Sequence, residues 1–171
     1  MIFRLSRHDD HKSILMGRDT VKLCEMQGFS PRLENDRQSR EEANIYGFRA
    51  EFAIARLFGL DPPEINVLTD GGVDLWIDDL SIDVKFSNNT NGPLIFDTAD
   101  KFKANCAILV CRTEDPRNMK IAGWMGKRDF CARAYSKDFG YGKRLVVDQK
   151  DLSPIEGFWL KVMERRFSPS G

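Results

Sequence analysis

Residues 71–86 read Gly-Gly-Val-Asp-Leu-Trp-Ile-Asp-Asp-Leu-Ser-Ile-Asp-Val-Lys-Phe, and apolar side chains alternate with other residues along both halves of this stretch. Such alternation is typical of two half-buried strands. If Asp78-Asp79 forms a two-residue turn, the apolar residues face one another across a hairpin. The expected pairs are Ile77 with Leu80, Leu75 with Ile82, and Val73 with Val84. Because a slip of one residue would turn the apolar set towards water, this register is well determined.

The same register places Asp74 opposite Asp83, with Cβ atoms about 5 Å apart, and Lys85 further along the same face. Like charges directly opposite one another destabilise a sheet, and Asp is a poor strand former. The alternative is an ordinary polar face turned towards solvent. We favour a divalent metal ion between the two carboxylates, and we expect the metal-free protein to become more stable when the Asp74 carboxylate is removed.

A helix is predicted over Ser39–Phe58, because apolar residues recur there at three- and four-residue steps. Ser39 and Glu42 have the spacing of a capping box. Glu51 adjoins the apolar stripe, which aims it towards a sheet that packs on this helix. Gly47 lies one turn earlier, and since a glycine costs about 1 kcal/mol inside a helix, it suggests close approach of a backbone or a ligand.

Together these positions resemble the PD-(D/E)XK nuclease superfamily, including its small phage and bacterial members. The resemblance rests on Glu51 in the helix, Asp74, and the run Asp83-Val84-Lys85. It extends to two expected strands, Ala104–Arg112 and Ile121–Met125, and covers the chain from Ile45 to Tyr135. Val73 stands where the motif has proline, and Ala50 stands where many relatives have glycine. The resemblance implies an α/β fold, a restriction-endonuclease-like mixed β-sheet of at least four strands flanked by helices.

The resemblance also implies metal-dependent hydrolysis of DNA phosphodiesters. Glu51, Asp74, Asp83 and the carbonyl of Val84 would bind Mg²⁺ or Mn²⁺, since hard cations prefer oxygen ligands. Lys85 would position or deprotonate the attacking water, or neutralise charge on the phosphate. By analogy, Asp83 and Asp74 are expected to matter most, Lys85 next and Glu51 least.

Charge is unevenly distributed, although the chain as a whole has a formal net charge of zero. Residues 101–171 hold 15 Lys and Arg against 8 Asp and Glu, whereas residues 1–100 hold 11 against 18. The basic half is therefore expected to follow DNA phosphates, and the alternative is that these charges only solubilise the surface. The expected DNA contacts are Lys101, Lys103, Lys127 and Arg128.

Length and composition indicate one soluble domain over residues 1–171, with a core at about 39–135 and an extension at each end. We expect a cytoplasmic protein, bacterial or phage-encoded, because the chain shows neither a signal peptide nor a long apolar run. Cys24, Cys106, Cys111 and Cys131 are interpreted as reduced, buried thiols. The run His8-Asp9-Asp10-His11 is interpreted as solvated surface.

The remaining segments are predicted coarsely. Residues 1–38 are expected to be interrupted at Gly17, Gly28 and Pro31, with a short helix over Asp19–Met26. The loop Asn88–Pro93 follows the hairpin and is a natural place to meet substrate. Other expected elements are a first strand at Ile65–Leu68, a helix at Lys127–Tyr135, an edge strand at Leu145–Val147 and a C-terminal helix at Phe158–Phe167.

The resemblance thus implies a magnesium-dependent DNA endonuclease acting on duplex or branched DNA. A homodimer or higher homo-oligomer is expected, because cutting two strands needs two sites. A Holliday-junction resolvase of the same fold is one alternative. An RNA-directed nuclease is a less favoured one. A catalytically silent nuclease-like module that only binds DNA or a protein remains open as well.

Overall fold

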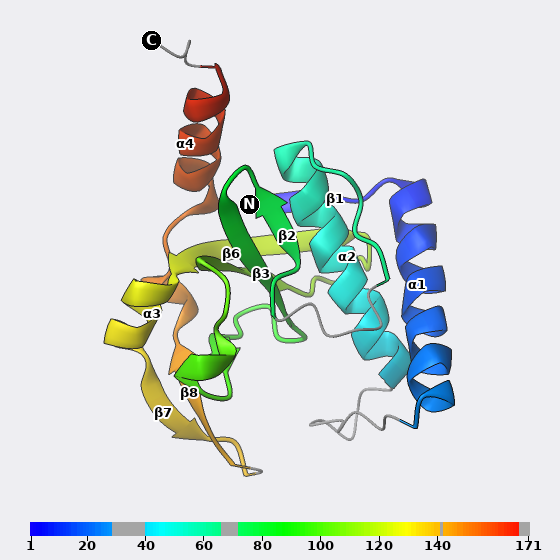
Figure 1. Cartoon of the computed structure of the whole chain (residues 1–171), viewed down its shortest axis with the longest axis horizontal. Helices are drawn as coiled ribbons and strands as arrows, with labels where there is room; N and C mark the ends of the chain where they lie inside the picture. Colours follow the sequence, from blue (N-terminus) through cyan, green and yellow to red (C-terminus); the bar gives the residue numbers. More distant parts are fainter. Residues whose placement is uncertain (29–39, 66–71, 141, 168–171) are drawn as a thin grey trace.

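The structure is a computed structural model that describes residues 1–28, 40–65, 72–140 and 142–167 (Figure 1). Its α-helices are α1 (Arg7–Met26), α2 (Arg40–Phe58), α3 (Lys127–Arg133) and α4 (Ile155–Phe167). Its strands are β1 (Ile2–Arg4), β2 (Leu75–Ile77), β3 (Leu80–Ser87), β4 (Leu94–Phe96), β5 (Cys106–Cys111), β6 (Asn118–Gly126), β7 (Tyr135–Asp138) and β8 (Lys143–Val147). Two 3₁₀ turns complete the described elements: η1 (Ala99–Lys101) and η2 (Gln149–Asp151). The chain is therefore α/β, as predicted.

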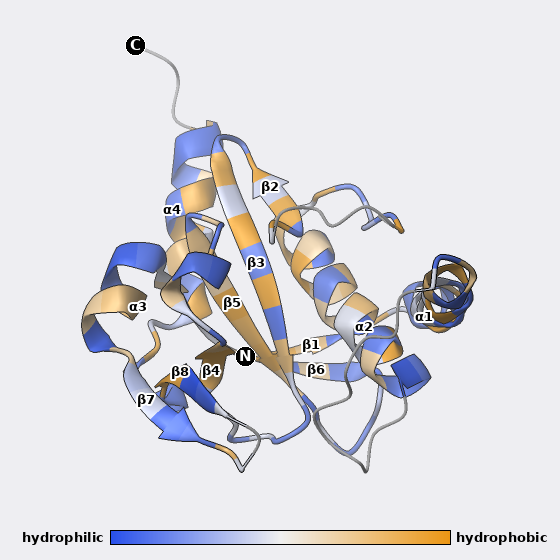
Figure 2. Cartoon of the chain, turned by 60° about the horizontal axis from the view of Figure 1, so that its bottom comes forward, coloured by the Kyte–Doolittle hydropathy of each residue, from blue (hydrophilic) through white to orange (hydrophobic). Residues whose placement is uncertain are grey.

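The larger sheet is mixed and has the strand order β1-β6-β5-β3-β2. The β3 and β5 strands are parallel, with Asp83 level with Ala107 and Lys85 level with Leu109, and the other pairs are antiparallel. All of β5 is buried, which explains its continuous apolar run, whereas β3 alternates between apolar and polar residues (Figure 2). The prediction of a mixed sheet of at least four strands flanked by helices is therefore confirmed.

Two hydrophobic cores lie on the two faces of this sheet. The first contains Ile82 and Val84 of β3 with the apolar side of α2, and α4 contributes Phe158. The second contains Ala107 and Leu109 of β5 with Phe96, Phe102 and Phe130 of the β4, η1 and α3 region. Because side chains alternate along β3, Asp83 and Lys85 face the second core while their neighbours face the first.

The α1 helix runs unbroken through Gly17, so the expected interruption there is wrong. Gly17 is buried against α2, and a Cβ on it would lie 2.5 Å from Cγ1 and 2.7 Å from the backbone N of Ile45. The glycine is thus explained by the close approach of two helices and not by a turn. The expected helix over Asp19–Met26 forms the second half of α1, while Pro31, and Ser39 of the expected capping box, lie outside the described residues.

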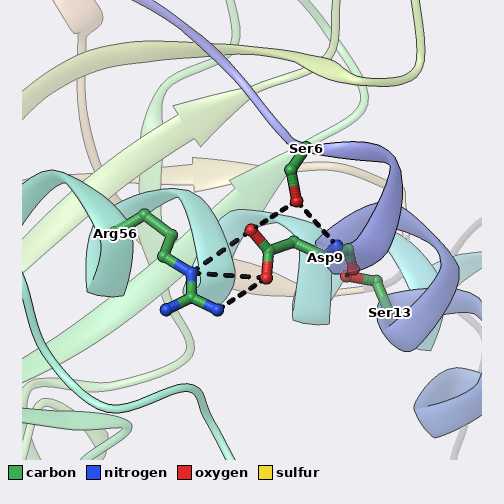
Figure 3. A network of polar contacts seen from close by, with 4 residues as sticks. All are labelled: Ser6, Asp9, Ser13 and Arg56. Atoms are coloured by element: carbon green, nitrogen blue, oxygen red, sulfur yellow. Dashed lines mark hydrogen bonds and ion pairs between the residues drawn. The ribbon is translucent and has the colours of Figure 1, made fainter.

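The interpretation of residues 8–11 as solvated surface is wrong for the two aspartates. Asp9 is 5% exposed, and it is bound by the Nε and Nη2 atoms of Arg56 and by the hydroxyl of Ser6 (Figure 3). Asp10 accepts a hydrogen bond from Arg49 at 2.8 Å. The Arg56 hydrogen bonds hold the pKa of Asp9 below its usual value. These ion pairs join α1 to α2, and the two histidines remain exposed.

A smaller sheet has the order β4-β8-β7. The strand expected at Leu145–Val147 forms as part of β8, but β8 is central, so the expected edge position is wrong. The two edges are β4 and β7, and all four residues of β7 are exposed. The α3 helix ends at Arg133, two residues earlier than expected, because Tyr135 begins β7. The first strand expected at Ile65–Leu68 falls almost wholly outside the described residues.

The four cysteines are free thiols. Cys106 and Cys111 are buried as expected, but Cys24 is only partly buried and Cys131 is exposed. Burial, reinforced by the nearby charge of Asp83, raises the pKa of the Cys106 thiol to about 12. None of the described helices is long and apolar enough to cross a membrane.

Candidate active site

The predicted hairpin forms with the predicted turn. Strands β2 and β3 are antiparallel, with Leu75 opposite Ile82, Trp76 opposite Ser81 and Ile77 opposite Leu80. The turn is at Asp78-Asp79, and Asp78 has a φ of 55°, in the left-handed region that Asp tolerates better than most residues. The register of the hairpin is therefore confirmed over these three pairs.

The Asp74 carboxylate takes the place of a main-chain acceptor at the start of β2. The N–H of Val84 would donate to the Val73 carbonyl in the predicted register, but it donates instead to Oδ2 of Asp74 at 2.6 Å. The backbone N–H of Asp74 donates to the Ile82 carbonyl at 2.8 Å, which ends the regular ladder there. The predicted Val73–Val84 pair is thus absent from the described ladder, and Asp74 bonds to the residues on both sides of Asp83.

Asp83 and Lys85 form an ion pair on the second face of the sheet. Oδ1 of Asp83 lies 2.6 Å from Nζ of Lys85, and the two side chains are 1% and 38% exposed. Nζ of Lys85 also lies 4.9 Å from the ring centroid of Phe96. A buried carboxylate is costly without a compensating charge, which the lysine supplies. The Lys85 side chain is therefore in contact both with the buried Asp83 carboxylate and with solvent, at the surface of the second core.

Glu51 lies on α2, the helix that packs on the opposite face of the sheet, and its side chain is half-buried. Among the described residues, no three His, Cys, Asp or Glu side chains gather closely enough to hold a metal ion. The structure thus brings Asp74, Asp83, Val84 and Lys85 together, but it does not add Glu51 to a group of three carboxylates. The metal site stays a prediction.

Gly47 does not make the close contact that its helical position suggested. A Cβ on Gly47 would meet no atom within 4 Å, since the glycine faces open space one turn before Glu51. No described part of the chain therefore explains this glycine by close packing.

The four basic residues expected to contact DNA are all exposed, and they lie around the second core. Phe102 lies between Lys101 and Lys103, and its ring centroid is 5.4 Å from that of Phe130 in α3, the helix that begins at Lys127. A Cβ on Gly72 would lie 3.4 Å from Cγ of Lys103. Lys101 and Lys103 therefore lie beside Gly72, which precedes Asp74 by two residues at the start of the hairpin.

Other basic residues are engaged within the protein. Arg112 binds Glu42 at 2.9 Å and stacks over the ring of Tyr46, while Arg144 binds Asp97 at 3.2 Å. Nζ of Lys120 donates to the Thr90 carbonyl and to Gln149, both at 2.8 Å. The Asn88–Pro93 segment is a loop as predicted, and Lys120 ties it to β6.

Two residues that the sequence reasoning passed over are also part of this region. Asn105 accepts hydrogen bonds through Oδ1 from the backbone N and the hydroxyl of Ser81. Trp76, directly opposite Ser81, is 60% exposed. The alternation of the hairpin places Trp76 on the same face as Asp83. A tryptophan on this otherwise polar face was the feature of the sequence that could have marked Trp76 as part of the site.

No family model, curated protein or solved structure matches this chain. The site is therefore interpreted from its own geometry.

Proposed function

We propose that this protein is a metal-dependent DNA endonuclease with a restriction-endonuclease-like fold, and that the β2–β3 hairpin is its active site. The observation that carries the proposal is the arrangement around Asp83. A buried aspartate is paired with a partly exposed lysine, and a second aspartate binds the residues on both sides of it. Exposed lysines stand next to the start of this hairpin.

The donor set fits Mg²⁺ in part. Mg²⁺ keeps several waters and is commonly held by one or two carboxylates together with substrate phosphates, so Asp74 and Asp83 suffice as protein ligands. Glu51, on the helix that packs on the other face of the sheet, is not part of this set. A bound Mg²⁺ or Mn²⁺ would supply charge stabilisation at the phosphate and an activated water.

Lys85 acts beside these carboxylates. In the hydrolysis, a water oxygen bonds to phosphorus, the bond from phosphorus to the 3′ oxygen breaks, and the water proton leaves as the 3′ oxygen gains one. The ammonium of Lys85 pairs with Asp83, and this position suits it to neutralise charge on the phosphate. Its partial exposure leaves the ammonium accessible to a phosphate.

A second candidate function is a nuclease-like module that binds DNA without cutting it. Both carboxylates already have partners within the protein: Asp74 accepts a hydrogen bond from Val84, and Asp83 pairs with Lys85. Each carboxylate could therefore stabilise the hairpin without binding a metal. Both functions predict DNA binding, and only the first predicts cleavage.

The test is incubation of supercoiled plasmid with the purified protein in Mg²⁺, Mn²⁺ or EDTA. We expect nicking or linearisation with either metal and none in EDTA. Asp83→Asn should lower the rate at least about 100-fold, because an electrostatic contact to the reacting group is lost. Glu164→Gln, which removes an exposed carboxylate on α4, is the matched control and should cut at the wild-type rate.

If wild type cuts neither plasmid nor a panel of branched and single-stranded DNAs, the nuclease proposal is overturned. Cleavage that survives Asp83→Asn would instead place the active site elsewhere. Preference for four-way junctions over linear duplex within the panel would identify a resolvase.

A further inference from the structure

Trp76 stands out among the exposed side chains of the hairpin. It occupies the middle of the edge strand β2 with 60% of its surface exposed, while Leu75 and Ile77 on either side are buried. Its cross-strand partner is Ser81, so it points to the same face of the sheet as Asp83 and Lys85. Diagonal neighbours across a strand pair lie about 7–8 Å apart, which brings the indole close to Asp83.

Two exposed lysines lie on the β5 side of this tryptophan, across β3. Asn105 is hydrogen-bonded to Ser81, directly across from Trp76, and Lys103 lies two residues before Asn105. The backbone N–H of Lys127 donates to the Asn105 carbonyl at 2.9 Å. The segment from Lys103 to Asn105 thus runs beside Ser81 of the hairpin, so the exposed Lys103 and Lys127 lie on the side of Ser81 away from the sheet edge.

The acidic turn next to Trp76 is partly neutralised. Asp78 lies 3.5 Å from Nη2 of Arg166, and Asp79 lies 3.6 Å from Nη1 of Arg165. Both arginines come from α4. The negative charges of Asp78 and Asp79 therefore repel an anionic ligand on the Trp76 face less strongly than unpaired aspartates would.

We propose that Trp76 is a stacking platform for an unpaired base of single-stranded DNA, with Lys103 and Lys127 contacting the flanking phosphates. An exposed aromatic ring among cationic side chains is how proteins hold single strands without reading their sequence. Bases within a continuous duplex are stacked on one another and do not offer a free face. This inference rests on the proposed function for the reaction, and it names the substrate as DNA that is single-stranded or unpaired near the cut.

The test is binding of a labelled dT20 oligonucleotide and of a fully paired 20-bp duplex, both in EDTA, so that binding is measured apart from cleavage. Trp76→Ala should weaken dT20 binding about 5- to 100-fold, the range of one lost stacking contact. It should change duplex binding less than about 2-fold. Trp76→Phe should retain most of the affinity, because phenylalanine also stacks. Leu160→Ala, which removes an exposed apolar side chain on α4, is the matched control and should bind like wild type.

Tryptophan fluorescence gives a second readout. The emission of wild type should be quenched by dT20, and most of this quenching should vanish in Trp76→Phe while binding persists. Failure of wild type to bind dT20, or wild-type affinity in Trp76→Ala, would overturn the platform.

The two proposals can fail separately. Asp83-dependent cleavage with unaltered dT20 binding in Trp76→Ala would overturn the platform alone. Loss of dT20 binding in Trp76→Ala, in a protein that cuts nothing, would support the platform and overturn the nuclease.

Discussion

Two regions of the molecule each bury an aspartate: the α1–α2 interface buries Asp9, and the β2–β3 hairpin buries Asp83. The two aspartates differ in their partners and in the exposure of their neighbours. Asp9 receives hydrogen bonds from Arg56 and Ser6, and its helix packs so closely on α2 that Gly17 has no room for a methyl group. Asp83 is paired with a lysine that reaches solvent, next to an exposed tryptophan and exposed lysines. A buried carboxylate therefore belongs to helix packing at Asp9 and to a candidate site at Asp83, and the exposure of the neighbouring side chains distinguishes the two cases.

The largest effect on stability is expected at Gly17. Gly17→Ala would place a Cβ within 3 Å of three atoms of Ile45, two of them backbone atoms, so the helices must separate. We expect a loss of about 1–3 kcal/mol in the free energy of unfolding, measured by urea denaturation. Unchanged stability would show that α1 and α2 are less closely packed than the structure has them.

Asp9 should make stability depend on acid. Its pKa is lowered in the folded state by Arg56, so its contribution is present above the unfolded pKa of about 4 and is lost as the pH falls through the lower folded pKa. Asp9→Asn should cost about 1–2 kcal/mol at pH 7, a figure reduced because the Arg56 side chain is 38% exposed.

The check is a series of denaturation curves between pH 7 and pH 3. The difference between wild type and Asp9→Asn should shrink as the pH falls. A difference that stays constant or grows would contradict the ion pair as its cause.

Two substitutions of Asp74 separate its charge from its hydrogen bond. The sequence predicted that removing this carboxylate would stabilise the metal-free protein, but the structure adds the hydrogen bond from Val84. Asp74→Ala removes the acceptor and should lower stability by about 1 kcal/mol. Asp74→Asn keeps an acceptor oxygen and removes the charge, so it should be neutral or stabilising. Thermal melting in EDTA measures both, and equal melting temperatures for the two variants would refute this assignment.

The smallest effect is expected at Gly47, on the same helix that Gly17 contacts. A Cβ there meets nothing, so Gly47→Ala should stabilise the protein by about 0.5–1 kcal/mol through helix propensity. Urea denaturation measures the gain. A loss of stability would mean that the open space is filled in solution.

Much of the hairpin was predictable from sequence because strict alternation fixes both the strands and their register, and the apolar run at Cys106–Cys111 indicated a buried strand. The burial of Asp9 was not predictable, since its partner Arg56 is 47 residues away and only the packing of α1 on α2 joins them. The central place of β8 was missed because its partner β7 is exposed on both faces and shows no apolar alternation.

Within the candidate site, Asp83 and Lys85 followed from alternation, because residues two apart on a strand share a face. The hydrogen bond from the Val84 N–H to the Asp74 carboxylate was not predictable from the sequence. The alternation of residues is the same whether Val84 donates to a main-chain carbonyl or to a side chain. The place of Glu51 depends on how α2 lies on the sheet, which no local pattern fixes.

The most direct measurement compares Asp83→Asn with Asp9→Asn in parallel assays of Mg²⁺-dependent plasmid cleavage and of unfolding free energy. We predict that folded Asp83→Asn loses at least about 100-fold in cleavage rate. Breaking its ion pair with Lys85 should lower stability by an amount similar to that of Asp9→Asn, because the two pairs are similarly exposed. Asp9→Asn should lose stability and, where it is folded, keep its cleavage rate. If Asp83→Asn lost stability but left cleavage unchanged, Asp83 would be a structural residue like Asp9, and the hairpin would not be the active site.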